Sequence, residues 1–347
     1  MNHENKFDKY YTFRIAMVND IEDIMEFIDK YWKKNHIMAR NRKLFEYQHL
    51  YGQKVTFVLA HRKENNELEA ILGYIPASAD ESKKDVWTAI WKVRDDHYNV
   101  PMLGLELIKR LEKLEQCRNI IIVGANPETA VPVMKIVMKY YTSRMSHFYR
   151  LGKCKEYRVA ANVKYIESIY TKESIKYTQL DEDAFRDAFR IIAKENQIQN
   201  VPYKDETYYI RRYYEHPYYK YDIYLIESEN GNGIIVLKNV EVNSRKISRI
   251  IDYVGCQSVF AQTGNFFTDL IRDKDLEYID FYCLNFDYKS IIKAGFIERK
   301  ADDVVIIPNY MEPFLQQNIE IYTCYNDNNC LIFKGDADQD RPNIIEE

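Results

Sequence analysis

The sequence predicts an α+β protein of two consecutive modules, each with a mixed sheet covered by helices. Three observations support this fold class. A chain of 347 residues exceeds what one hydrophobic core usually organises and suits two domains. An apolar share of 46% with 29% charged residues is typical of globular proteins and excludes a disordered chain. One order of predicted strands and helices also occurs twice, on either side of a boundary between residues 155 and 156.

The first half begins with a strand and an amphipathic helix. FRIAMV (13–18) is a short apolar run, and Asn19 and Asp20 offer a helix cap before apolar residues that continue at helical spacing to Trp32. A weaker helical stretch lies near 43–50. We then expect three strands, at 55–61, 68–75 and 86–93. They are followed by an amphipathic helix at 105–114, a buried β-branched strand at 119–125, a helix from Pro127 to about 141 and a last strand at 144–151.

The second half repeats this order. IKYTQL (175–180) is a predicted strand, and Asp181 caps a helix whose apolar face carries Phe185, Phe189 and Ile192. We expect a second helix at 207–216 and a three-strand meander at 221–228, 233–240 and 248–255. After the meander we expect a helix at 265–273, a buried strand at 278–284, a helix ending near Gly295, and a final strand pair of 304–308 with 330–334.

This order of elements resembles the fold of the GNAT-type N-acetyltransferases, here as two tandem modules over residues 1–155 and 156–347. NFDYKSIIKAGFIER (285–299) looks like the helix-to-strand signature that closes the family's fold, and NPETA (126–130) matches only the start of it. The resemblance implies acetyl-CoA or another acyl-CoA as co-substrate and an amine as the acceptor.

Three further segments look like those of uncharacterised acyltransferase-like proteins of bacterial surface-polysaccharide synthesis. They are NHIMARNRKLF (35–45), IPNYMEPF (307–314) and DADQDRPN (336–343). This second resemblance implies a small-molecule acceptor, the amine of a nucleotide-linked amino sugar.

In the GNAT family the acyl-CoA lies where the fourth strand parts from the fifth, and the next turn binds the pyrophosphate. Here that turn is NVPMLGLE (99–106), which meets the family pattern Gln/Arg-x-x-Gly-x-Gly/Ala only at Gly104. The loop 256–265 of the second module also lacks the full pattern. Helix N-termini and positive charges favour phosphates. We therefore expect the cofactor to contact the first module, at Val93, Arg94, Met102, Leu103, Gly104 and Leu105.

The tyrosine that often protonates the departing thiolate in the family is missing from both modules. Ile291 occupies its place in the second module, and Met134 is the nearest counterpart in the first. Either water or another tyrosine would then supply this proton, or one or both modules have lost catalysis.

Three residues are candidates for the base that an amine nucleophile needs. His36 has an unperturbed pKa near physiological pH, although a surface or structural role stays open. Asp252 lies in the otherwise apolar run RIIDYVG, where a buried carboxylate is either a site residue or part of a structural pair. Glu312 lies in a loop stiffened by two prolines, where it could form a pocket wall.

The acceptor is expected to contact two segments. The first lies between the first helix and the meander, and its polar and aromatic side chains suit a sugar or a phosphate, with a solvated loop as the alternative. The second is the acidic segment that follows the last strand, which we expect to dock back on the protein and shape the acceptor site. The expected contacts are Arg40, Arg42, Phe45, Tyr47, Asp336, Asp338, Asp340 and Arg341.

A metal site is not expected. Asp336, Asp338 and Asp340 match the first positions of a calcium loop, but Arg341 then replaces the required glycine and Pro342 follows. Six scattered cysteines with no CxxC pair indicate reduced thiols in the cytoplasm. A net charge of −4 without a basic stripe argues against nucleic acid, and no apolar run is long enough to span a membrane.

Three functions stay open at this point. The first is an N-acyltransferase that acts on an amino sugar. The second is a non-catalytic protein that binds carbohydrate or protein through degenerate GNAT folds, which the missing glycine and tyrosine residues favour. The third keeps catalysis but takes its acyl group from an aminoacyl-tRNA, against which the slightly acidic balance argues. The sequence leaves the oligomeric state undetermined.

Overall fold

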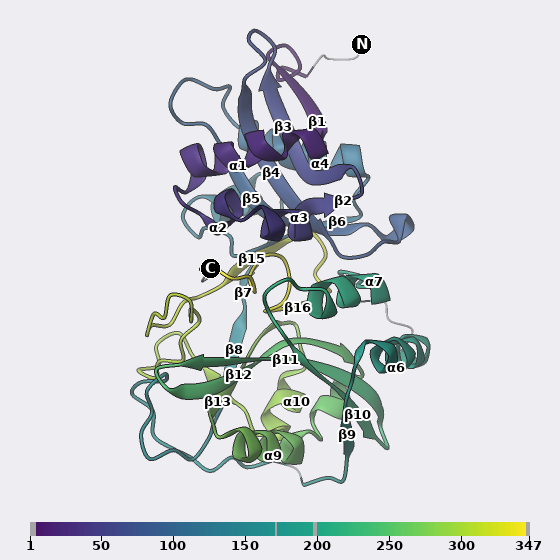
Figure 1. Cartoon of the computed structure of the whole chain (residues 1–347), viewed down its shortest axis with the longest axis vertical. Coiled ribbons are helices and arrows are strands. Elements are labelled where there is room, and N and C mark those ends of the chain that lie inside the picture. Colours follow the sequence, from purple (N-terminus) through teal and green to yellow (C-terminus); the bar gives the residue numbers. More distant parts are fainter. Residues whose placement is uncertain (1–4, 171, 197–199, 345–347) are drawn as a thin grey trace.

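Two mixed sheets of eight strands each form the two halves of the protein, one stacked on the other (Figure 1). The computed structural model describes residues 5–170, 172–196 and 200–344. Each half has a hydrophobic core of its own, a further core contains residues of both halves, and the segment that ends at the described C-terminus lies between them. This arrangement is the tandem α+β fold that the sequence predicts.

Sheet A forms the first half and has the strand order β1-β3-β4-β5-β6-β15-β7, with β2 beside β3. Strands β1, β3, β4 and β5 are antiparallel neighbours, and β6 runs parallel to β5. The bounds are β1 Tyr11–Met17, β2 Leu50–Tyr51, β3 Lys54–Arg62, β4 Leu68–Pro76, β5 Asp85–Val93, β6 Asn119–Val123, β7 Tyr141–Arg144 and β15 Tyr322–Tyr325.

Sheet B forms the second half and has the order β14-β8-β13-β12-β11-β10-β9, with β16 beside β13. The pair β12 and β13 is parallel, as β5 and β6 are in sheet A. The bounds are β8 Ser146–Leu151, β9 Lys176–Gln179, β10 Asp222–Ser228, β11 Gly231–Val242, β12 Arg245–Gly255, β13 Leu276–Leu284, β14 Ile297–Arg299 and β16 Ile332–Phe333.

Helices cover both faces of sheet A because its central strands are apolar on both sides. Val55, Phe57 and Leu59 of β3 pack with α1, α2 and α3, whereas Val58 and Ala60 pack with α4 on the opposite face. The helices of the whole chain are α1 Ile21–Phe27, α2 Ile37–Arg40, α3 Arg42–His49, α4 Leu103–Glu115, α5 Ala130–Ile136, α6 Glu182–Asn196, α7 Glu206–Tyr209, α8 Gln257–Phe260, α9 Gly264–Lys274 and α10 Tyr288–Lys293.

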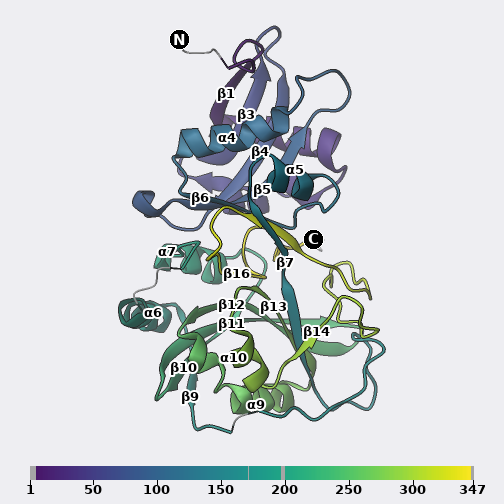
Figure 2. The same ribbon diagram turned by 180° about the vertical axis from the view of Figure 1, so that it is seen from behind.

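Each half lends one strand to the other. β8 directly follows β7 of sheet A, yet it lies between β13 and β14 of sheet B. β15 lies between β14 and β16 in the sequence, yet it is inserted between β6 and β7 of sheet A. Figure 2 shows β7 and the C-terminal segment (yellow) crossing at the junction of the halves. The two halves are therefore interlocked through their sheets.

Three predicted elements differ from the structure. The expected strand at 144–151 is two strands in different sheets, which separate at Met145, whose N–H donates to the carbonyl of Ile321. The helix expected to reach about 141 ends at Ile136. The expected final pair of 304–308 with 330–334 is wrong, because 304–308 makes only an isolated bridge to Ala161 and β16 pairs with β13.

The exchange of strands predicts that fragments 1–155 and 156–347 fold together but not alone. Each fragment lacks an interior strand of its own sheet, so unpaired strand edges would remain on both sides of the gap. We expect each purified fragment to show no cooperative thermal unfolding by circular dichroism, and the mixture to form a 1:1 complex in size-exclusion chromatography. A cooperative transition in either isolated fragment would contradict this expectation.

Candidate functional site

A cavity of about 570 Å³ opens in the first half where β5 and β6 part. Parallel pairing runs from Asp85–Asn119 to Thr88–Ile122 and then stops, while β5 continues to Val93. A β-bulge in β5 shifts its register against β4 in the stretch that follows Thr88. Beyond Thr88 the edge of β5 that faces β6 has no partner strand among the described residues. We call this cavity the β5–β6 slot.

The first turn of α4 lies at the slot and has free backbone donors. The N–H groups of Leu103 and Glu106 donate to the carbonyls of Val100 and Met102, whereas those of Gly104 and Leu105 have no partner among the described residues. A Cβ at Gly104 would lie 3.2 Å from Nε1 of Trp91, which donates to the Gly104 carbonyl, so the indole would have to shift to admit a side chain. Free donors at a helix N-terminus are suited to an anion.

Four of the six predicted cofactor residues line the slot: Val93, Met102, Gly104 and Leu105. Leu103 instead points into the core that α4 shares with sheet A. The lining residues that the sequence reasoning missed include Trp32, Trp91 and Lys92. Lys92 could have been found, because it is the cation nearest to Val93 on the same predicted strand.

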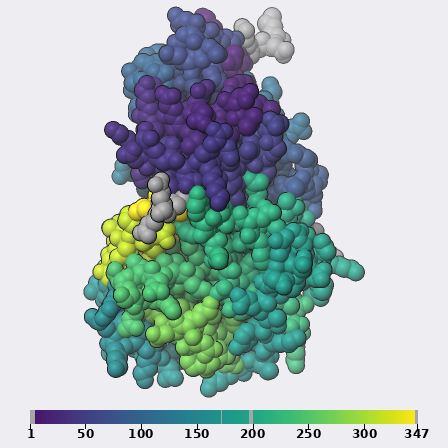
Figure 3. Space-filling model, viewed as in Figure 1, coloured from purple at the N-terminus to yellow at the C-terminus, as the bar shows by residue number. Residues whose placement is uncertain are grey.

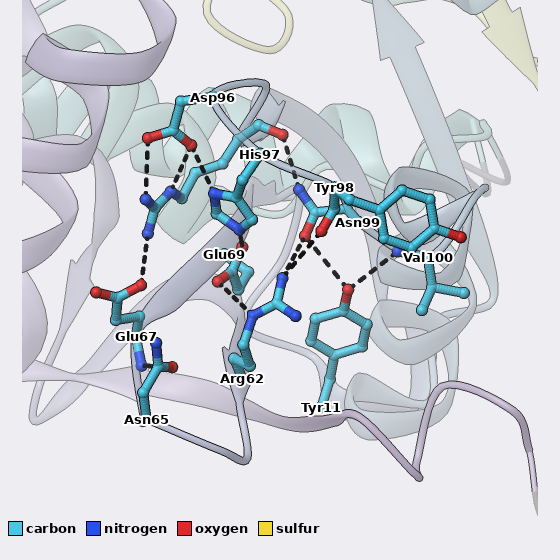
Figure 4. Close-up of polar contacts among 11 residues, drawn as sticks. Tyr11, Arg62, Asn65, Glu67, Glu69, Asp96, His97, Tyr98, Asn99 and Val100 are labelled. Carbon is cyan, nitrogen blue, oxygen red and sulfur yellow. Dashed lines mark hydrogen bonds and ion pairs between the residues drawn. The ribbon is translucent and has the colours of Figure 1, made fainter.

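Arg94 does not line the slot, and carboxylates of two turns bind it: Asp96 after β5 and Glu67 before β4, both labelled in Figure 4. Its guanidinium pairs with Asp96 at 3.0 Å and with Glu67 at 3.2 Å. The hydrogen bond to Asp96 raises the pKa of Arg94 above its usual value, and the two carboxylates balance the charge of its guanidinium. Glu69, which is fully buried, accepts from Arg62 and binds His97 in the same network. Lys92 lines the slot instead and makes a surface ion pair with Asp95.

The corresponding parting in the second half is filled by the main chain. Pairing of β12 with β13 stops at Ile250–Phe281, and β16 then pairs with the end of β13. The N–H of Gly335 donates to the carbonyl of Ile251 on β12, so residues 332–335 bridge the two strands. No side chain fits at Gly335, because a Cβ would lie 2.4 Å from the Tyr213 hydroxyl. We call this position the β12–β13 slot; it is closed.

Asp252 lies at this closed slot, where it pairs with Lys204. The ammonium of Lys204 donates to both oxygens of Asp252, at 2.9 and 2.8 Å, and lies 2.7 Å from Asp336. The Tyr213 hydroxyl donates to the same carboxylate. Burial alone would lower the pKa of Lys204, but the two carboxylates hold it above its usual value. Asp252 is therefore part of a structural ion cluster, in which Lys204 and Tyr213 already bind its carboxylate.

The aspartates of the C-terminal segment do not point to one face, because residues 334–340 form turns and not a strand. Asp336 is fully buried, and burial followed by the effect of Asp252 raises its pKa to about 6 against the opposing charge of Lys204. Asp340 accepts from Lys238 at 2.9 Å and from Tyr221 at 2.7 Å. Asp338 lies 3.4 Å from Arg341.

His36 is the N-cap of α2, and its ring contacts Trp32, which lines the slot. Its Nδ1 accepts from the N–H of Met38 at 3.3 Å, and its ring packs edge-on against Trp32 at 4.6 Å between centroids. Burial, with smaller effects of Arg341 and Lys33, lowers its pKa to about 3. His36 is neutral at pH 7 and is a weak base in this setting.

The other predicted site residues are spread over several surroundings. Arg40 and Arg42 make exposed ion pairs with Asp29 and with Glu22 and Glu46, respectively. Phe45 is fully buried in the core, stacked on Phe57, so it cannot touch an acceptor. Tyr47 donates to the carbonyls of Arg211 and Arg212 and thereby joins the two halves. Glu312 accepts from the Tyr219 hydroxyl at 3.0 Å and lines a small cavity beside Arg341.

The described residues contain no group of three or more His, Cys, Asp or Glu side chains placed to hold a metal ion. None of their helices is both long and apolar enough to cross a membrane.

Comparison with known proteins shows the fold. No family model and no curated protein matches the sequence. A GCN5-related N-acetyltransferase from Anabaena variabilis aligns over 91% of this chain and 72% of its own, with 10% identity and a TM-score of 0.56. A probable N-acyltransferase of unknown function from Enterococcus faecalis aligns over 91% and 71%, with 8% identity and a TM-score of 0.52. The chain thus has the GNAT-type acyltransferase fold, as two tandem modules.

The ion cluster predicts that Asp252→Asn destabilises the protein without removing a catalytic group. The substitution leaves Lys204 buried with one carboxylate, so we expect the free energy of unfolding to fall by about 3 to 5 kcal/mol in urea titrations. Asp187→Asn, at an exposed pair with Arg190, should change it by less than about 0.5 kcal/mol. Equal stability of both variants would show that the cluster does not hold the closed slot together.

Proposed function

We propose that this protein is an N-acyltransferase that binds acyl-CoA in the β5–β6 slot and transfers the acyl group to an amine. The observation that carries the proposal is the parting of β5 from β6 over a 570 Å³ cavity that ends at the free N–H groups of Gly104 and Leu105. The pyrophosphate of the donor would bind these N–H groups, with Lys92 as the nearby cation. The pantetheine arm would lie along the free edge of β5.

The reaction we propose is direct attack of the amine on the thioester. The amine nitrogen bonds to the carbonyl carbon, the carbon–sulfur bond breaks, and the CoA thiolate takes up the proton that the amine loses. An unpaired N–H on the edge of β5 would stabilise the oxyanion. Lys92 is the only titratable side chain among the described residues that line the slot, so ordered water would carry the proton.

The acceptor we propose is the amine of a nucleotide-linked amino sugar used in surface-glycan synthesis. Two of the three segments that resemble proteins of that process, 307–314 and 336–343, line one small cavity on the face of sheet B. His36, in the remaining segment 35–45, is close enough to Arg341, in the segment 336–343, for their charges to interact. Acyl-CoA and nucleotide sugars are intracellular metabolites, so we place the reaction in the cytoplasm.

A second candidate is a non-catalytic protein that binds carbohydrate or protein, and the closed β12–β13 slot favours it for the second module. The two candidates differ in what binds. A sugar nucleotide that raises the melting temperature when no acyl-CoA does would support the binding protein.

The open slot predicts that acetyl-CoA stabilises the native protein. At a concentration of about one hundred times Kd the gain is about 2.7 kcal/mol, which raises the melting temperature by a few degrees in a thermal-shift measurement. Ala89→Phe places a ring in the slot and should abolish the shift. Ala193→Phe, a half-buried alanine of α6 in the other half, is the matched control and should keep it. A wild-type protein that shows no shift would count against the proposed function.

The buried setting of His36 predicts that His36→Asn retains activity. Asparagine caps helices at least as well as the present residue, and a histidine with a pKa of about 3 contributes little as a base. With any amino sugar that the wild type acylates, the rate of CoA thiol release should stay within about threefold. A loss of about a hundredfold or more, with the acetyl-CoA thermal shift kept, would assign the base to His36.

A further inference from the structure

A small cavity rich in positive charge lies beneath the C-terminal segment, between that segment and the face of sheet B. Four cations line it, with only two carboxylates, Glu312 and Asp340. The cations are Lys238, Arg249, Lys334 and Arg341. Figure 3 shows the C-terminal segment (yellow) at the surface between the two halves. We call it the tail cavity.

Three of the four cations already have a carboxylate partner. Arg249 lies 2.7 Å from Asp280, Lys238 lies 2.9 Å from Asp340, and Arg341 lies 3.4 Å from Asp338. Lys334 differs from them. Within the described part of the chain, no carboxylate lies within ion-pair distance of its ammonium.

Lys334 is nevertheless 97% buried, and only one of its three donors is used, on the main-chain carbonyl of Gln339 at 2.7 Å. A buried ammonium without a counterion is costly. Burial and the nearby Arg249 and Lys238 lower the pKa of Lys334 to about 7, against the opposing charges of Asp340 and Asp280. An anion in the cavity would remove this cost, because it would supply the missing counterion.

The size of the tail cavity and its position relative to the slot indicate which anion it holds. Its volume is about 50 Å³, and since one water needs roughly 10–15 Å³, it holds a few waters or one phosphate group. Gln339 separates it from the β5–β6 slot: its carbonyl accepts from Lys334, and its side-chain Nε2 donates to the carbonyl of Val123, which lines the slot. Gln339 therefore contacts a residue of each cavity, Lys334 in one and Val123 in the other.

We propose that the tail cavity binds a phosphate group of the acceptor, with Lys334 as the cation that contacts it. The inference rests on the proposed function and assigns a subsite to its acceptor: the phosphate binds in the tail cavity, and the amino group reaches past Gln339 into the β5–β6 slot. A nucleotide-linked amino sugar has this layout, because its diphosphate is attached directly to the sugar ring.

The experiment measures pyrophosphate binding by isothermal titration calorimetry with CoA present at saturation. CoA occupies the phosphate-binding helix end of the slot, so the remaining pyrophosphate heat reports a separate site. We expect wild-type protein to bind pyrophosphate, and Lys334→Met to raise its Kd by at least about tenfold, through the loss of one charge-assisted hydrogen bond. Lys92→Met is the matched control and should show the reverse: weaker CoA binding with the pyrophosphate Kd unchanged once CoA saturates.

The same titrations show whether the proposal fails by itself. CoA binding without pyrophosphate binding, or pyrophosphate that competes with CoA, overturns the tail-cavity site while leaving the donor slot intact. Malonate that binds as tightly as pyrophosphate overturns the assignment to phosphate. If Lys334→Met fails to bind CoA, and is therefore misfolded, the half-buried Arg341→Gln replaces it, and a pyrophosphate Kd unchanged in that variant also overturns the proposal.

Discussion

The path of the chain from Tyr322 to Asp340 is the constraint on which the other features depend. This segment completes sheet A as β15, returns to sheet B as β16 and ends in turns anchored by buried Asp336 and Asp340. Its partners lie in both halves, so neither half can move far without breaking strand pairing or an ion pair. The slot, the closed parting and the tail cavity all keep their relative positions for this reason.

The two halves show how one fold gives two different sites. In both sheets a parallel pair of strands parts, after Thr88 in β5 and after Ile250 in β12. In sheet A the lent strand pairs on the far side of β6 and leaves the parting open. In sheet B the chain itself enters the parting at Gly335, and Lys204 draws Asp252 and Asp336 together there. Whether the parting is open thus depends on where the connecting segment runs.

The sequence predicts what depends on local pattern. The continuous apolar run of β6, the helix α4 and the parting beside them follow from periodicity and from the resemblance to the GNAT fold. The lent strands could not be predicted, because YTCY (322–325) has no pattern that indicates its distant partners. The pairing of Arg94 with Asp96, two residues away, was visible in the sequence and argues against a free phosphate-binding arginine. The partners of Lys204 depend on contacts between remote segments.

The lent strands also affect how the protein is made. During translation β6 and β7 leave the ribosome long before β15, which is the strand that joins them. The newly made first half therefore has an open strand edge while most of the second half is still being synthesised. β8 likewise stays unpaired until its partner strand β13 has been synthesised. Such edges invite aggregation and chaperone binding. The two halves consequently mature as one unit, at a time set by the synthesis of the C-terminal segment.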